Sequence, residues 1–234
     1  MECQKIEVVG VAGTGKSTLA RTLADRDPGN RIADSLHTRT SAHWAYVAHS
    51  VPSVLPLVAR SARVRPAFDW EETKFIVYVT EWRRVLRRAC RDDSGLVVLD
   101  QGPIFALARL LWGRKPVTAT REFERWLDVQ VAGWSVDLDG IVWLEAPDEV
   151  LLERINEREQ DHEAKGRSVR QGLDVLLAHQ SAYGVLFQRL EALGRPPVFT
   201  FDTSVMSSVR IAEEIEVVLG RGPSQRPVNA GPSR

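Results

Sequence analysis

The sequence predicts an α/β fold in which helices cover both faces of a five-stranded parallel sheet. Short apolar segments alternate along the chain with longer amphipathic ones, as strands and helices do in such folds. Most of the apolar segments are continuous runs, typical of strands buried on both faces. Three polar or glycine-containing segments fall at predicted strand ends, Gly10–Ser17, Asp100–Pro103 and Asp202–Ser204. Ligands bind beyond the carboxyl ends of parallel strands, so we expect one site there.

The predicted elements follow from hydrophobic spacing and from turn residues. The predicted strands are Lys5–Val9, Arg31–Asp34, Ser94–Asp100, Asp139–Glu145 and Pro197–Asp202. The predicted helices are Lys16–Arg26, Trp70–Cys90, Pro103–Trp112, Glu122–Trp134, Ala146–Glu159, a long helix capped by Ser168 and Gln171 and stopped by Gly194, and Val205–Leu219. Prolines interrupt the helical pattern of Ser41–Pro66, which predicts short, angled helices.

Composition excludes several classes of protein. The 31 basic residues balance 31 acidic ones, so we expect neither a nucleic-acid partner nor a membrane partner. The amino terminus does not have the pattern of a signal peptide, and a cytoplasmic location is expected. The two cysteines, Cys3 and Cys90, form no disulfide framework and no metal-ligand spacing, and we expect each to be a buried or incidental thiol.

The stretch "GVAGTGKS" matches the phosphate-loop pattern G-x-x-x-x-G-K-[ST]. It follows a predicted strand and opens a predicted helix, as this motif requires. Glycines allow the backbone N–H groups to turn inward as an anion nest, and the helix amino terminus points at the same place. We expect Lys16 to reach the outer phosphates and Ser17 to bind Mg²⁺. The predicted nucleotide-binding residues are Gly10, Ala12, Gly13, Thr14, Gly15, Lys16, Ser17 and Thr18.

Asp100 ends the apolar run "GLVVLD". A carboxylate at this place can hold magnesium or its water shell. The alternative is an aspartate that only initiates the following turn. The phosphate loop elsewhere in the chain favours the magnesium role.

Taken together, these motifs resemble those of the P-loop nucleoside and nucleotide kinases, which include thymidylate kinases and deoxynucleoside kinases. The resemblance spans Lys5–Leu219. Beyond the phosphate loop and the acid-ended strand, it rests on "WLEAPDEVLLERINER", on a charged segment before a long helix, and on "FTFDTS". The phosphate loop is specific, and the other segments are a weaker pattern match.

The resemblance implies a three-layer α/β/α P-loop sandwich that binds ATP with Mg²⁺. It implies a single kinase domain over residues 1–220, with a helical acceptor-binding region at 38–90 and a lid at 154–170. Residues 221–234 read as a disordered tail. The resemblance assigns catalytic roles to Lys16 and Asp100, and it assigns Arg154, Arg158 and Arg167 to the lid over the transferring phosphoryl group.

The acceptor side leaves alternatives open. Kinases of this group usually carry arginine after the acid, whereas this chain has Gln101, and a glutamine can hydrogen-bond a neutral hydroxyl or amide but cannot neutralise a phosphate. Asp34 corresponds in place to the acidic base of deoxynucleoside kinases, and the alternative is a solvated turn residue. Arg39 would suit a phosphorylated acceptor, and Trp70 is a candidate for stacking on a ring.

The leading hypothesis is a kinase that transfers the γ-phosphoryl group of MgATP to a hydroxyl of a nucleoside-like or other small metabolite. A nucleoside monophosphate kinase is the alternative within the same class. An ATPase switch acting on a protein partner is the alternative of another class. The apolar helix Glu122–Trp134 could pair between subunits, which would give a homodimer.

Overall fold

A five-stranded parallel sheet lies at the centre of the molecule, as the sequence predicts. The structure is a computed structural model that describes residues 3–33, 54–57, 59–60, 68–90, 95–112, 116–158 and 162–221. The strands are β1 (Gln4–Val9), β2 (Arg31–Ala33), β3 (Leu96–Asp100), β4 (Gly140–Glu145) and β5 (Val198–Asp202), in the order β2-β3-β1-β4-β5. Val8 pairs with Asp100, so the end of β3 lies beside the end of β1.

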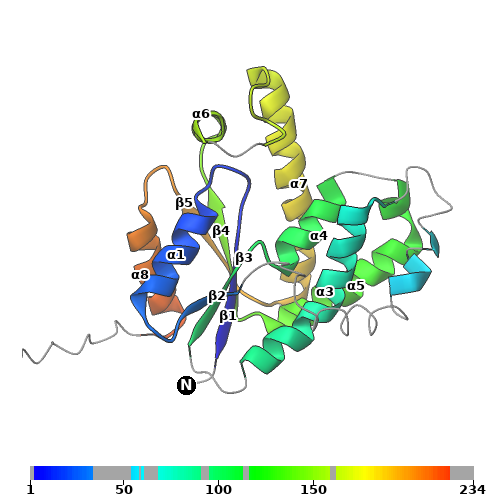
Figure 1. The fold of residues 1–234 in the computed structure, drawn as a ribbon, viewed down its shortest axis with the longest axis horizontal. Helices are drawn as coiled ribbons and strands as arrows, with labels where there is room; N and C mark the ends of the chain where they lie inside the picture. The colour runs from blue at the N-terminus through cyan, green and yellow to red at the C-terminus, as the bar shows by residue number, and fades with distance from the viewer. Residues whose placement is uncertain are drawn as a thin grey trace, which may run out of the picture.

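Helices cover both faces of this sheet, which makes three layers (Figure 1). On one face lie α1 (Lys16–Arg26) and α8 (Ser208–Val218), packed on Ile6 and Val8. On the other face lie α3 (Trp70–Ala89), α4 (Pro103–Trp112), α5 (Arg121–Asp137) and α7 (Val169–Leu193), with the short 3₁₀ helix η1 (Pro116–Ala119) before α5. The predicted α/β/α sandwich is confirmed.

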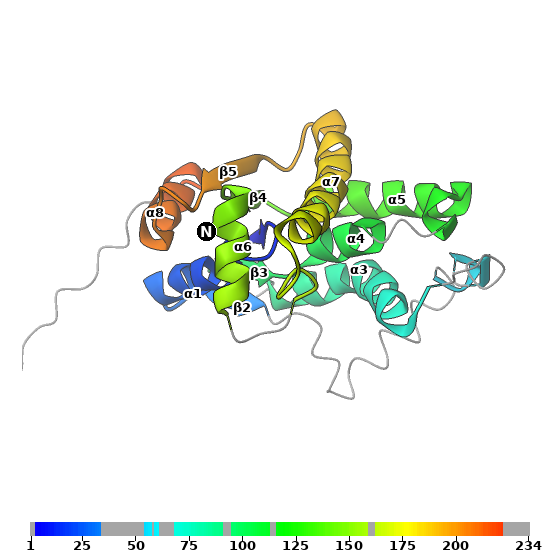
Figure 2. The same ribbon diagram turned by 90° about the horizontal axis from the view of Figure 1, so that it is seen from above.

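Helix α6 (Asp148–Glu157) crosses the end of the sheet where the strands terminate, between α1 and α7 (Figure 2). Its apolar residues Leu151, Leu152 and Ile155 form a small separate core with Val11 and with Leu176 of α7. Through Val11, this core packs against the loop that follows β1. The helix begins two residues later than predicted, because Pro147 takes an extended conformation and acts as the cap.

Side-chain caps set other helix boundaries. The predicted capping box of α7 is present, with Ser168 and Gln171, and Gly194 ends the helix in the left-handed conformation. Helix α3 has a reciprocal pair that the sequence analysis missed: Asp69 accepts from the Glu72 N–H, and Glu72 accepts from the Asp69 N–H.

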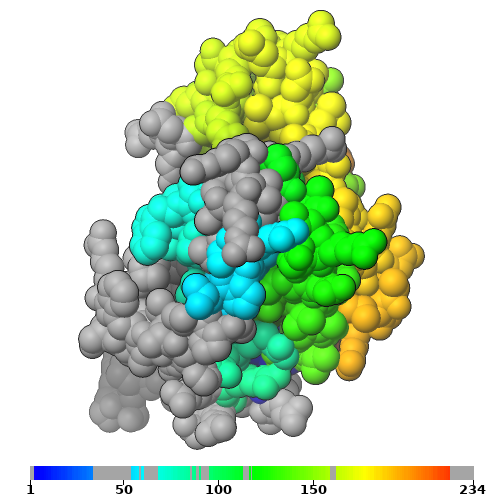
Figure 3. Space-filling model, turned by 90° about the vertical axis from the view of Figure 1, so that its right-hand side faces the viewer, coloured from blue at the N-terminus to red at the C-terminus, as the bar shows by residue number. Residues whose placement is uncertain are grey.

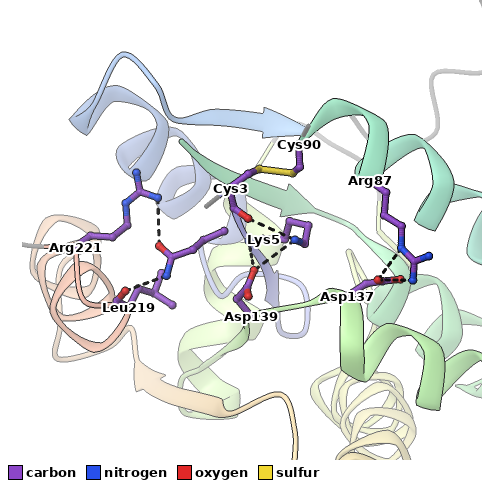
Figure 4. Close-up of polar contacts among 9 residues, drawn as sticks. Cys3, Lys5, Arg87, Cys90, Asp137, Asp139, Leu219 and Arg221 are labelled. Carbon is purple, nitrogen blue, oxygen red and sulfur yellow. Dashed lines mark hydrogen bonds and ion pairs between the residues drawn. A yellow bond between two sulfur atoms is a disulfide. The ribbon is translucent and has the colours of Figure 1, made fainter. Parts of the chain in front are cut away.

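The prediction for the cysteines is wrong, because Cys3 and Cys90 form a disulfide (Figure 4). They are 87 residues apart in sequence, but the end of α3 reaches the amino end of β1, and their Cα atoms are 5.4 Å apart. Nearby, the Nζ atom of Lys5 lies 3.7 Å from Oδ2 of Asp139, and Arg87 forms an ion pair with Asp137. These contacts lie at the end of the sheet opposite to the phosphate loop.

Figure 3 shows the face on which the beginning of α7 rises above α4 and α5. The large apolar residues of α5, including Phe123, Leu127 and Trp134, are buried in the core of the same chain. The apolar pattern that suggested a homodimer is therefore largely used within the subunit. In the described part of the chain, no helix is both long and apolar enough to span a membrane.

Candidate active site

The loop between β1 and α1 is the first component of the site, and it lies at the end of the sheet (Figure 1). Gly10, Gly13 and Gly15 have φ angles of 150°, 87° and 81°, which favour glycine. A Cβ atom at Gly10 would lie 2.5 Å from the carbonyl oxygen of Leu144, so a larger residue does not fit. The sequence pattern therefore matches the backbone conformation of a phosphate loop.

Helix α1 supplies the second component. It begins at Lys16, directly after Gly15, and no side chain caps its amino terminus. Ser17 and Thr18 are exposed on its first turn. The Thr14 hydroxyl donates to the Val11 carbonyl across 2.9 Å and thereby closes the loop. The amino terminus of α1 and the loop backbone together fit an anion such as a phosphate.

Lys16 lies between the loop and the end of β3. Its Nζ atom donates to the Val11 carbonyl oxygen across 2.9 Å. Burial lowers the pKa of Lys16 to about 8; the negative charge of Asp100 opposes this shift and the positive charge of Arg158 adds to it. The fold thus brings together three charged side chains that are widely separated in sequence, as the kinase hypothesis requires.

The surroundings of Asp100 test whether the site fits a magnesium ion. Its Oδ1 atom is buried and has no hydrogen-bond partner among the described residues. An unpaired buried carboxylate oxygen is costly unless a ligand completes it. Magnesium prefers oxygen ligands and usually binds one or two protein groups together with phosphates and water. The carboxylate of Asp100 and the hydroxyl of Ser17 fit that requirement.

Within the described ranges, no group of three or more His, Cys, Asp or Glu side chains could hold a metal by itself.

Gln101 follows Asp100 with a φ of 61°, a value unusual for a residue other than glycine. Its exposed side chain lines the hollow above the phosphate loop. Gln101 therefore lies beside the phosphate loop, and its substrate role stays a prediction.

The three predicted lid arginines lie in different surroundings. Arg154 donates to the Gly13 carbonyl across 3.2 Å and to the Thr203 hydroxyl and carbonyl across 3.0 Å each, so it braces the phosphate loop. Arg158 lines the hollow above the loop, and its buried Nε has no partner in the described chain. Arg167 lines a second hollow further along α7.

Two hollows adjoin at this end of the molecule. The larger, about 820 Å³, is lined by the phosphate loop with Lys16, by Gln101 and Phe105, and by Arg158. The smaller, about 470 Å³, lies between the beginning of α3, the end of α4 and the first half of α7. Four residues line both hollows and form their common wall: Arg109, Trp112, Glu163 and His179.

The common wall is held by an ion pair and by stacked rings. The Nη2 atom of Arg109 lies 3.4 Å from Oε1 of Glu163, and the Cζ atom of the same guanidinium lies 4.4 Å from the ring centroid of Trp112. Trp112 stacks on His179 with ring centroids 3.5 Å apart. Burial first, and then the charges of His162 and Arg109, lower the pKa of His179 to about 3, so it is neutral.

His179 and its neighbours are not among the site residues predicted from the sequence. His179 is 3% exposed, because α4 brings Trp112 over it. Arg109 and Trp112 belong to the predicted helix Pro103–Trp112, Arg109 three residues before its end and Trp112 at its end. Nothing in the sequence of that helix indicated that they would face α7.

Of three other predicted substrate residues, the structure describes only Trp70. Trp70 is 71% exposed and lines neither hollow. Asp34 and Arg39 lie outside the described residues, so the structure leaves their roles as predictions. Glu7, by contrast, was not singled out, although it is a fully buried carboxylate next to this site.

A family model described as "AAA domain" matches residues 6–182. The chain belongs to this AAA domain family. The match covers the phosphate loop, α3, α4, α6 and the first half of α7. No curated protein matches this AAA domain chain significantly.

Solved structures show that the fold of this AAA domain is shared with nucleoside and nucleotide kinases. Deoxyadenosine kinase from M. mycoides with bound dATP is 15% identical at a TM-score of 0.53, over 92% of this chain and 99% of that one. Thymidylate kinase from Candida albicans is 10% identical at a TM-score of 0.56, over 94% of this chain and 92% of that one. At these identities the similarity concerns the fold, which agrees with the resemblance drawn from the motifs.

Proposed function

We propose that this protein is an ATP-dependent kinase that transfers the γ-phosphoryl group of MgATP to a hydroxyl of a small, nucleoside-like or other metabolite. The observation that carries the proposal is the meeting of Lys16, Asp100 and Arg158 above a phosphate loop, in a hollow that adjoins a second one. The kinase fold of the similar structures supports the same reaction class.

The larger hollow would take the triphosphate. The loop backbone and the amino terminus of α1 would bind the outer phosphates, and Lys16 would neutralise their charge. Arg158 would donate to the oxygens of the phosphoryl group in transfer, where one positioned donor contributes about 3–4 kcal/mol. Mg²⁺, held by Ser17 and Asp100, would supply further neutralisation of the phosphate oxygens.

The smaller hollow would take the acceptor, and its charge favours an alcohol over a phosphate. Five carboxylates and two guanidinium groups line it: Asp69, Glu71, Glu72, Glu163 and Asp174, with Arg109 and Arg167. A nucleoside monophosphate would bring two negative charges into a predominantly acidic hollow, which is unfavourable. Phe75, Trp112 and His179 supply ring faces on which a flat ring could stack.

Asp34 would act as the base that accepts the proton of the attacking hydroxyl. The strand register supports this role indirectly. Ala33, which precedes Asp34, pairs with Leu99, which precedes Asp100. Arg39 remains a proposed acceptor contact, whereas Trp70, which lines neither hollow, is left out of the proposed acceptor site. A cytoplasmic location, a homodimer and the lack of a nucleic-acid partner also stay predictions.

The test is ADP release from MgATP with a panel of nucleosides, nucleoside monophosphates and other hydroxylated metabolites, followed by mass spectrometry of the products. We expect a phosphorylated alcohol, formed by the wild-type protein but not by Lys16→Ala. A phosphorylated monophosphate would instead establish the nucleoside monophosphate kinase. Hydrolysis of ATP with no phosphorylated acceptor would favour the ATPase switch and a protein partner.

A further inference from the structure

A charged residue interrupts the apolar strand β1. Glu7 lies between Ile6 and Val8, which face α1 and α8, and its own side chain faces α4 on the other side of the sheet. The residue is 0% exposed. A carboxylate buried to this degree needs strong partners, and here they come from one helix.

Glu7 caps α4 from a different strand. Its Oε2 accepts from the Ile104 N–H and its Oε1 from the Phe105 N–H, each across 2.8 Å. N–H groups in the first turn of a helix have no acceptor within the helix, so they need one from elsewhere. Burial raises the pKa of Glu7 to about 8, and the hydrogen bonds from the Phe105 and Ile104 N–H groups oppose this shift. Both oxygens of Glu7 therefore hold the beginning of α4 against the sheet.

The turn before α4 is shaped to this carboxylate. A Cβ atom at Gly102 would lie 2.7 Å from Glu7 Cδ and 2.9 Å from Leu99 Cβ, so only glycine brings the turn this close. The preceding residue, Gln101, is held at a φ of 61°. A non-glycine residue keeps such a conformation only when its surroundings impose it.

We call the contacts of Glu7 with the Ile104 and Phe105 N–H groups the Glu7 clamp. The clamp adjoins the groups proposed to act in the reaction. Glu7 is paired with Leu99 in the strand register, one position before Asp100. Tyr183 of α7 is buried beside the backbone of Gly10, and Tyr78 of α3 is buried as well; burial and the charge of Glu7 raise the pKa of both phenols. Glu7 thus lies where β1, α3, α4 and α7 meet beneath the phosphate loop.

We propose that Glu7 is a positioning residue: by holding the first turn of α4, it fixes the turn that orients Asp100 and Gln101 toward the phosphate loop. The inference rests on the proposed function for the meaning of that orientation. The inference also leads to a separate prediction about magnesium. The Asp100 oxygen proposed as its ligand is oriented by the Glu7 clamp, so Mg²⁺ binding should depend on Glu7.

The first experiment measures ADP binding with and without Mg²⁺ by calorimetry, which needs no acceptor. In Glu7→Gln one carboxylate oxygen becomes an amide NH₂ that faces a backbone N–H and cannot accept from it. The quantity to compare is the factor by which Mg²⁺ raises the affinity for ADP. We expect this factor to be at least about 10-fold smaller in Glu7→Gln than in the wild type, while the ADP affinity without Mg²⁺ differs by less than about 3-fold.

Asp137→Asn is the matched control. Asp137 is also a buried carboxylate, 8% exposed in its side chain, and pairs with Arg83 and Arg87 far from the phosphate loop. We expect this variant to lose stability while its Mg²⁺ effect stays as in the wild type. Equal loss of the Mg²⁺ effect in both variants would reduce Glu7 to a general stabilising residue and overturn the proposal.

Gly102→Ala reaches the same clamp from the other side and carries the test if Glu7→Gln does not fold. Its added methyl group must displace Glu7 or the turn, and we expect the same selective loss of the Mg²⁺ effect. A folded variant with wild-type Mg²⁺ dependence would contradict the proposal. If an acceptor is known, kcat should fall about 10-fold or more while the KM for ATP changes little.

Failure of the proposed function is distinguishable from failure of this inference. If no acceptor is phosphorylated but the Mg²⁺ effect on ADP binding is lost in Glu7→Gln, the clamp stands and the kinase proposal falls. If an acceptor is phosphorylated at wild-type rate and Mg²⁺ dependence by folded Glu7→Gln, the kinase stands and the clamp falls.

Discussion

The two hollows at the end of the sheet are built in different ways. One wall of the larger hollow is part of a continuous stretch, the phosphate loop, from which Gly10, Val11, Ala12 and Lys16 line it; its other walls are side chains from distant segments. The smaller one is made by side chains from α3, α4, α7 and the segment before α7, which are up to about a hundred residues apart in sequence. A site made of local backbone is specified by a short motif, whereas a site made of side chains depends on how distant helices pack.

The largest expected effect is on the larger hollow, where Lys16→Ala should lower the rate of phosphoryl transfer. Lys16→Ala removes the one side-chain cation of the loop, and we expect phosphoryl transfer to fall about 1,000-fold or more. The fold should persist, because Lys16 belongs to none of the apolar core clusters. Circular dichroism and ADP release measure the two effects. Turnover near the wild-type rate would remove the phosphate-loop mechanism.

The next effect concerns Asp34, the proposed base. Asp34→Asn should lower kcat for a hydroxyl acceptor about 100-fold, because the amide cannot accept the proton. The KM for ATP should change little. Steady-state kinetics with the acceptor found by the panel measure both values, and an unchanged kcat would leave Asp34 as a turn residue.

A pH titration sharpens the account of the larger hollow. Burial, opposed by Asp100 and assisted by Arg158, lowers the pKa of Lys16 to about 8. Lys16 is charged below that pH and neutral above it, so ADP affinity should decline as pH rises from 7 to 9, by up to about tenfold per pH unit above the pKa.

Lys16→Arg is the control for this titration, since a guanidinium stays charged throughout the range. Its ADP affinity should be lower or equal at pH 7 but nearly independent of pH. An equal pH dependence in Lys16→Arg and the wild type would show that another group titrates.

The smallest effect tests the side-chain-built hollow. Asp174 is exposed on α7 and lines only the smaller hollow. Asp174→Asn should change the KM for the acceptor about 3-fold to 5-fold and leave the KM for ATP unchanged, since an exposed charge contributes modestly. Glu191→Gln, near the other end of α7, is the matched control. A change in the KM for ATP alone would contradict the division into two hollows.

Local signals account for what the sequence predicted. The five strands, the phosphate loop and the caps of α7 at Ser168 and Gly194 each follow from a few adjacent residues. Asp100 followed from the apolar run before it, and the structure places it beside Lys16.

Non-local contacts account for what it did not predict. The Cys3–Cys90 disulfide depends on where α3 ends relative to β1, and no spacing in the sequence encodes that. The burial of His179 depends on Trp112 of α4, which is 67 positions earlier in the chain. Glu7 falls between the local and the non-local cases. A charge within the apolar run "KIEVV" was visible in the sequence, but its partners on α4 lie about a hundred residues away.

The measurement that tests the central claim most directly follows the phosphoryl group itself. MgATP labelled with ¹⁸O in its γ-phosphoryl group is incubated with the protein and the acceptor found by the panel, and all products are weighed by mass spectrometry. The account predicts one labelled phosphoryl group on the acceptor hydroxyl for each ADP formed, and none with Lys16→Ala. Label found only in free phosphate, with the acceptor unmodified, would contradict it.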